Sequence, residues 1–187
     1  VEGSSKEKKI INIDIEEKAT GEIAAGAGVG TSGKSISFTV AENNYMGKGV
    51  KLNTALSISD ETIMGKFSIT QPNWRYTDNS LKTTFERSEI DRLTNFGYKT
   101  QKTGVSVGTS YEQYQNFYIS PEFDTYYETL NTSNSASAAL KKQDGDYFDT
   151  TFKYVLKYDK RNQRYQPTDG YVSSFFQSLP LISDDYS

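Results

Sequence analysis

The sequence of 187 residues contains no Cys and no His, and its formal net charge is −3. These features exclude zinc sites built on His or Cys, Ser-His and Cys-His catalytic triads and disulfide bonds, and they give no basic surface for nucleic acid. No apolar run approaches the roughly 20 residues that a membrane-spanning helix requires. The chain does contain 14 Tyr and 10 Phe, and such aromatic content favours β-strands.

The first residues of the chain differ in pattern from the remainder. Residues 1–8 are polar and charged, and in residues 9–17 the apolar Ile11, Ile13 and Ile15 alternate with polar residues. This alternation predicts a short strand. The sequence has neither an initiator Met nor a signal peptide, so we expect it to be a piece of a longer protein.

From Gly21 onward the chain is a succession of segments in which apolar and polar residues alternate. A period of two predicts strands that expose one apolar and one polar face. Pro72 ends the fourth segment, because Pro cannot donate a hydrogen bond to a neighbouring strand. The predicted strands are residues 21–30, 34–43, 50–59, 62–71, 81–88, 97–111, 117–127, 147–159 and a last one that begins at 171–178.

The connections between these strands are expected to differ on the two sides of the sheet. Polar loops are predicted at 89–95 and at 130–146, the second with a helical turn near 136–142, although the loops at 31–33 and 59–61 on the same side are short. Turns that are compact or carry Pro and Gly are predicted on the other side, at 43–49, 72–79 and 160–170. Short turns on one side and longer loops on the other are typical of outer-membrane barrels. Aromatic residues that would suit the membrane interfaces are Tyr45, Trp74, Tyr76, Tyr111, Tyr126, Tyr127, Tyr147 and Tyr158.

Two architectures fit this pattern, a soluble β-sandwich or barrel and a lipid-embedded barrel. The segments are roughly ten residues long, which is the length that a tilted strand needs to cross a bilayer. Soluble strands are usually about five or six residues long. We therefore predict an all-β fold, an antiparallel up-and-down transmembrane β-barrel. Bacterial single-chain barrels close with an even number of strands and an open edge is costly in lipid, so the barrel is expected to be incomplete.

Five short motifs follow one another along the chain. Residues 15–21 lead into the first long strand, residues 26–30 alternate Gly with apolar residues, and residues 69–74 end a strand at Pro72. The other two motifs are turns, formed by Asn44, Tyr45, Gly47 and Gly49 and by Arg164, Pro167, Thr168, Asp169 and Gly170. In this order and at these spacings the sequence resembles the N-terminal half of the barrel in the Omp85 superfamily of outer-membrane proteins. Val29 stands where that family often has an aromatic residue, and the family's Arg-Gly-aromatic loop is not in this sequence.

The resemblance implies a domain organisation and a location. Residues 1–19 would be the C-terminal tail of a POTRA domain, including its last strand, and the junction to the barrel. Residues 20–187 would be the N-terminal half of the barrel. The location implied is the bacterial outer membrane, with the N-terminal end in the periplasm.

The resemblance also implies a function, the assembly and insertion of β-barrel proteins into the outer membrane. No catalytic residue, cofactor or metal is expected. The expected partners are unfolded outer-membrane proteins, outer-membrane lipids and accessory lipoproteins of an assembly complex, and no nucleic acid. In this family the first and last strands pair weakly, so the first strand can pair with an incoming strand.

The residues of that pairing edge would be Glu22, Ile23, Ala24, Ala25, Gly26, Ala27, Gly28 and Val29. Small side chains give little cross-strand packing, which suits a strand that must exchange partners. We therefore predict that Pro at Ala25 or Ala27 impairs assembly more than Pro in an outer loop. The simpler interpretation is that Gly and Ala relieve crowding in a tightly curved sheet.

Three other functions remain open from the sequence: an Omp85-type secretion transporter, of the two-partner or the translocation-and-assembly kind, a general outer-membrane porin, and an outer-membrane enzyme. The turn at 167–170 would serve any hairpin. The carboxylate pairs at Glu16, Glu17 and at Asp184, Asp185 are most simply solvated charges, since no base or metal ligand stands near them in the sequence.

Overall fold

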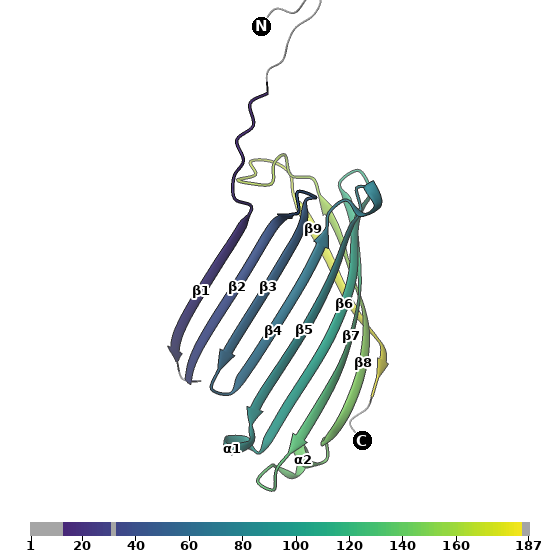
Figure 1. Ribbon diagram of the computed structural model, residues 1–187. Helices are drawn as coiled ribbons and strands as arrows, with labels where there is room; N and C mark the ends of the chain where they lie inside the picture. The colour runs from purple at the N-terminus through teal and green to yellow at the C-terminus, as the bar shows by residue number, and fades with distance from the viewer. Residues whose placement is uncertain (1–12, 31–32, 185–187) are drawn as a thin grey trace, which may run out of the picture.

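The computed structural model describes residues 13–30 and 33–184. Nine strands form one antiparallel sheet in which each strand pairs with the next along the chain (Figure 1). The strands are β1 (Gly21–Gly30), β2 (Gly33–Tyr45), β3 (Val50–Ser59), β4 (Thr62–Gln71), β5 (Ser80–Arg92), β6 (Tyr98–Tyr114), β7 (Phe117–Thr132), β8 (Gly145–Asp159) and β9 (Val172–Ser183). Three short helical segments are η1 (Trp74–Tyr76), α1 (Leu93–Phe96) and α2 (Ala138–Lys141). Among the described residues, no helix is long and apolar enough to cross a membrane.

The sheet curves into an incomplete cylinder, with β9 lying behind the middle strands in the view of Figure 1. In the described part of the chain β1 and β9 form its two edges. One end of the sheet carries the connections at 46–49, 72–79, 115–116 and 160–171, and we call it the turn end. The opposite end, with residues 60–61, 93–97 and 133–144, is the loop end.

The prediction of an up-and-down antiparallel barrel, incomplete in this chain, is confirmed, and β1, β3 and β4 have the predicted bounds. The loops predicted at 89–95 and 130–146 are wrong in part, because β5 continues to Arg92 and β7 to Thr132. Polar side chains pair across β5 and β6 where the apolar alternation stops. Lys99 Nζ lies 2.6 Å from Glu89 Oε1 and 3.5 Å from Asp91 Oδ2. The backbones of β5 and β6 therefore remain paired beyond the segment in which apolar and polar residues alternate.

The predicted contrast in connection length is also wrong. The loop end has a connection as short as residues 60–61 and one as long as residues 133–144. The turn end ranges similarly, from residues 115–116 to residues 160–171. The extension of β5 and β7 shortens the loops, so length does not distinguish the two ends.

The strand predicted at 9–17 lies only partly within the described residues. Residues 9–12 lie outside them, and residues 13–20 have no regular secondary structure. The predicted strand is therefore wrong for residues 13–17. The assignment of residues 1–19 to a POTRA tail stays a prediction.

One face of the sheet is apolar across all nine strands, and we call it the apolar face. The register places Ile23 opposite Val40, Phe38 opposite Leu56 and Phe67 opposite Phe85. Phe38 is 44% exposed, Leu56 41% and Phe85 49%. A soluble sandwich would bury these side chains under a second layer, but no second layer of described residues covers them. An apolar face left bare is what a lipid-facing barrel wall requires.

The opposite, polar face carries charged residues in its middle. Lys66 Nζ lies 3.7 Å from Glu86 Oε2, and Lys153 forms an ion pair with Asp124. Lys102 Nζ stands 3.4 Å from the centroid of the Tyr126 ring, a cation–π geometry. Charges at this depth are tolerated where water can reach them, as in the interior of a barrel.

Candidate functional site

Strand β1 is the least covered strand of the sheet. Each of its residues is exposed, and the apolar Ile23 and Val29 are 71% and 84% exposed. Strand β2 pairs with it along its whole length, from Gly21 opposite Glu42 to Gly30 opposite Gly33. The other side of β1 has no strand beside it among the described residues.

The hydrogen bonds between β1 and β2 show which residues of β1 direct their backbone N–H and C=O groups toward the open side. The N–H of Asn43 donates to the carbonyl of Thr20 at 3.1 Å, in register with the ladder. In an antiparallel ladder such pairs alternate, so every second residue turns its N–H and C=O away from the partner. The residues that face β2 are Glu22, Ala24, Gly26 and Gly28. The residues that face the open edge are Ile23, Ala25, Ala27 and Val29.

The glycines of β1 have a packing reason on the polar face. A Cβ at Gly26 would lie 3.0 Å from Ser37 Oγ, and one at Gly28 would lie 3.2 Å from Ser35 Oγ. Both distances are shorter than ordinary van der Waals contact, so Gly lets β2 and its serines approach. The interpretation that these glycines relieve crowding is therefore supported at both positions, beside any role at the edge.

The start of β1 is fixed to β2 by a carboxylate. Glu42 Oε1 accepts hydrogen bonds from the hydroxyl of Thr20 and, at 2.7 Å, from the N–H of Asn44. The side-chain amide of Asn43 also donates to the Thr20 carbonyl at 3.1 Å. Glu42 was not singled out in the sequence analysis, because it acts through Thr20, which lies 22 positions away in the chain. These bonds hold the turn end of β1, and among the described strands the rest of β1 pairs only with β2.

The predicted turn at residues 44–49 is built around Asn44. Its side-chain oxygen accepts from the N–H of Gly49 at 2.6 Å, and its carbonyl accepts from Gly47 at 3.0 Å. Gly47 has φ of 70° and Gly49 of 66°, the left-handed region that glycine tolerates best. Tyr45, the remaining residue of the motif, is the last residue of β2.

The motif at residues 164–170 lies in the connection between β8 and β9. Asn162, which the sequence did not single out, organises it. The Asn162 amide donates to Thr168 Oγ1 at 2.8 Å, and its oxygen accepts from the N–H groups of Thr168 and Asp169 at 3.3 and 3.4 Å. Gly170 has φ of 88°, and a Cβ there would lie 2.1 Å from the Lys160 carbonyl oxygen. Only Gly fits this position.

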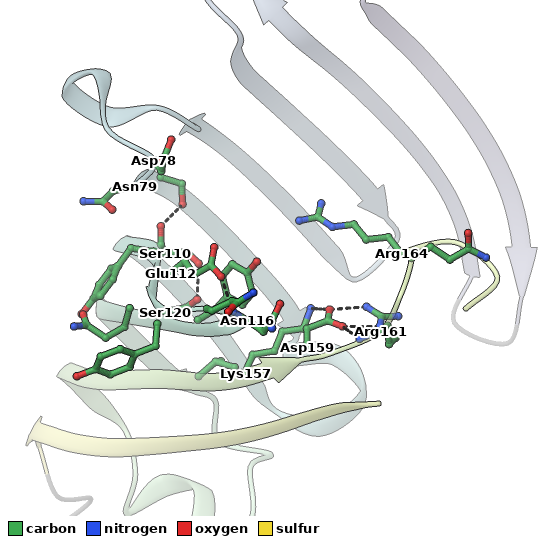
Figure 2. A pocket seen from close by; sticks show the side chains of 18 of the residues that line it. Asp78, Asn79, Ser110, Glu112, Asn116, Ser120, Lys157, Asp159, Arg161 and Arg164 are labelled. Atoms are coloured by element: carbon green, nitrogen blue, oxygen red, sulfur yellow. Dashed lines mark hydrogen bonds and ion pairs between the residues drawn. The ribbon is translucent and has the colours of Figure 1, made fainter. Parts of the chain in front are cut away.

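A polar basin of about 900 Å³ lies at the turn end of the polar face (Figure 2). Asp159 on its wall accepts hydrogen bonds from Arg161 Nε and Nη2 at 2.8 and 2.7 Å, and Lys157 lies 3.0 Å away. The paired Asp159 carboxylate raises the pKa of the Arg161 guanidinium above its ordinary value. Arg164 extends away from this pair in Figure 2.

The predicted site residues fall into separate places. Residues 22–29 pair with residues 34–41 of β2, whereas the turn at 44–49 follows β2 and is joined through Glu42 to Thr20, the residue before β1. Pro72 follows directly after the last residue of β4, and residues 164–170 lie in another connection at the same end of the sheet. Among the described residues, no group of three or more His, Cys, Asp or Glu could hold a metal ion.

Comparison with known proteins bears on the whole sheet. The model of the Omp85 superfamily domain matches residues 44–185. The chain belongs to the Omp85 superfamily. Its fold is similar to that in the crystal structure of BamA from Haemophilus ducreyi lacking POTRA domains 1–3, with a TM-score of 0.64 and 20% sequence identity. The match covers 89% of this chain and 35% of that chain, so this chain spans about a third of that structure.

Membership in the Omp85 superfamily makes this chain part of an outer-membrane β-barrel, and the open sheet is a portion of such a barrel. The residues that match the superfamily model begin at the Asn44 turn and include the β8–β9 connection. The edge strand β1 lies before the matched residues.

Proposed function

We propose that this Omp85 barrel segment assembles β-barrel proteins into the outer membrane by pairing the open edge of β1 with a strand of the substrate. One observation carries the proposal: β1 turns the backbone groups of Ile23, Ala25, Ala27 and Val29 to a side with no described neighbour. Unpaired N–H and C=O groups in lipid are strongly unfavourable, so an incoming strand gains a full ladder there. Side chains of Ala and Gly let that strand leave again.

The arrangement of partners follows from this proposal. The turn end, where residues 13–20 enter β1, would face the periplasm, from which unfolded outer-membrane proteins and accessory lipoproteins arrive. Lipids would cover the apolar face. The protein would act without a catalytic residue or cofactor, since strand exchange draws its free energy from the ladder and from burial of the substrate in lipid.

The test compares two Pro substitutions in β1. One removes an N–H group that points to the open edge, and the other removes an N–H group that donates to β2. Ala25→Pro removes a donor from the open edge, and Ala24→Pro removes one from the β1–β2 ladder. Each variant is made in the full-length protein and tested for complementation after depletion of the native copy, with folding checked by heat-modifiable gel mobility. We expect Ala25→Pro to fold and to lose assembly activity, whereas Ala24→Pro also lowers the folded fraction.

Ser135→Pro in the 133–144 loop is the matched control, because the Ser135 N–H donates no backbone hydrogen bond to any described residue. It should retain full complementation. If Ala25→Pro and Ser135→Pro complement equally well, the edge-pairing proposal is wrong.

An Omp85-type secretion transporter is the second candidate. The polar face, with its charged middle and the basin at its turn end, would suit the passage of an unfolded chain. Under that function Ala25→Pro would leave export intact, whereas filling the basin with Ser120→Trp would block release of the passenger. Measuring both in one strain separates the two functions.

A further inference from the structure

The apolar face is hollowed around Gly65 of β4. The hollow measures about 460 Å³ and is lined by side chains of β3, β4, β5 and β6. A Cβ at Gly65 would meet no atom within 4 Å. Leu56 stands opposite Gly65 on one side, and Phe67 and Phe85 pair along the next row of the same face. Because Gly65 has no side chain, it leaves a groove among the large apolar side chains of this face.

An arginine stands on the rim of this hollow. Arg87 is directly opposite Gly65 across β4 and β5, on the same face, and it is exposed. Its Nη1 donates to Thr103 Oγ1 at 3.2 Å. In the described part of the chain no carboxylate lies within ion-pair distance of Arg87, so most of its N–H groups are available to a ligand. This position marks the border where the apolar face gives way to the polar strand extensions.

The nearest acidic groups on that border already have cationic partners. Glu89 accepts from Lys99 and, at 2.8 Å, from Gln101 Nε2. Asp91 lies 3.5 Å from the same lysine. Arg87, Glu89, Asp91 and Lys99 together carry no net charge, and Arg87 is the cation of this group that has no carboxylate within 4 Å among the described residues. A guanidinium binds phosphate through paired hydrogen bonds, and a groove of this size and character fits a hydrocarbon chain.

We propose that this hollow, the Gly65–Arg87 groove, binds a lipid A molecule of the outer leaflet, with one acyl chain over Gly65 and a phosphate on Arg87. The choice of lipid A rests on the proposed orientation, in which the loop end faces the cell exterior. The groove lies toward that end, beside the border formed by Arg87. An arginine at the edge of an apolar band meets lipid phosphate because it extends to the interface while its stem stays in hydrocarbon.

The test measures lipid A binding to the full-length protein in detergent by native mass spectrometry. Arg87→Gln should weaken binding of lipid A by about tenfold, the loss expected for a charge-assisted hydrogen bond. Gly65→Leu, which fills the groove, should weaken it by roughly fivefold. Lipid A without its phosphates should bind equally to the native protein and to Arg87→Gln.

Two control variants keep this test specific. Arg75→Gln removes an arginine that lies over Trp74 at the turn end, 5.6 Å from the ring centroid. Thr83→Leu adds apolar bulk to the apolar face outside the groove. Both should bind lipid A as the native protein does.

Equal binding of lipid A by the native protein and Arg87→Gln overturns the groove proposal, as does equal binding of lipid A and phosphatidylglycerol by the native protein. Arg87→Gln changes an exposed side chain and removes its hydrogen bond to Thr103, so the variant is expected to fold and decides the question even if Gly65→Leu fails to fold. Assembly activity is not the readout, so this result is independent of the β1 edge. Labelling of a single Cys placed at Ser135 in whole cells separately tests the orientation.

Discussion

The first four strands and the next four are held together in different ways. Strands β1, β3 and β4 are each 10 residues long, whereas β6, β7 and β8 have 17, 16 and 15. Each ion pair among the described residues includes a residue of β5 or later. The buried Thr84, Leu130, Ala136 and Tyr147 also lie there. The first half thus relies on its ladder and on the hydrogen bonds of Glu42 and Asn44, while the second half adds ion pairs and buried side chains.

The largest expected difference between the halves concerns their turns. Gly170→Val should abolish the β8–β9 turn, because its Cβ would lie 2.1 Å from the Lys160 oxygen at a φ of 88°. Gly47→Ala in the β2–β3 turn meets no atom within 4 Å and pays only for its positive φ, about 1 kcal/mol. Urea titration of both variants, followed by gel mobility of the folded form, measures the difference. Equal midpoints would show that the two turns are equally permissive.

A smaller effect is expected from the loop end of the second half. Leu130 is 7% exposed, and the 133–144 loop is held nearby by the Ser133 N–H, which donates to the Gly97 carbonyl at 2.8 Å. Leu130→Ala should cost about 2 kcal/mol and expose this loop to trypsin. Ile58→Ala on the apolar face, where Ile58 is 44% exposed, should cost under about 1 kcal/mol in detergent. Similar losses for both would remove the distinction between the halves.

The smallest effect depends on pH. The hydroxyl and the N–H of Thr132 hold the pKa of Asp144 below its ordinary value. A depressed folded-state pKa stabilises the loop above the unfolded-state pKa, and this stabilisation is lost as pH falls through the folded-state value. Thr132→Val should therefore loosen the loop at neutral pH and match the native protein in acid. The measurement is hydrogen exchange of residues 133–144, corrected for intrinsic rates. A difference in exchange between Thr132→Val and the native protein that persisted in acid would contradict the prediction.

Much of the fold could be read from the period-two alternation, since the bounds of β1, β3 and β4 follow it residue by residue. The alternation failed where both faces turn polar, as in the pairs of β5 with β6 beyond Arg87. The sequence left open whether the apolar face meets lipid or a second layer. No second layer of described residues covers this face, and membership in the Omp85 superfamily makes the sheet part of an outer-membrane barrel.

The candidate site was predicted only in part. Residues 22–29 and the glycine-bearing turns lay in local patterns that a sequence displays. Glu42, Asn162 and Arg87 did not, because each acts through a residue brought near by the ladder or the chain reversal. Which N–H groups of β1 face β2 and which face the open edge could not be predicted either, because this depends on the register between the two strands. The register in turn depends on the length of the β1–β2 connection.

In β1 the N–H and C=O groups of every second residue point to the open edge. This spacing would restrict the register in which an added strand could pair with β1. A register shift of one residue would turn the apolar side chains of the substrate strand from the apolar face to the polar face of the sheet. Favourable positions are therefore spaced two residues apart, roughly 7 Å along the strand. If β1 pairs with a substrate strand as proposed, Ile23, Ala25, Ala27 and Val29 would therefore favour strands in which apolar and polar residues alternate.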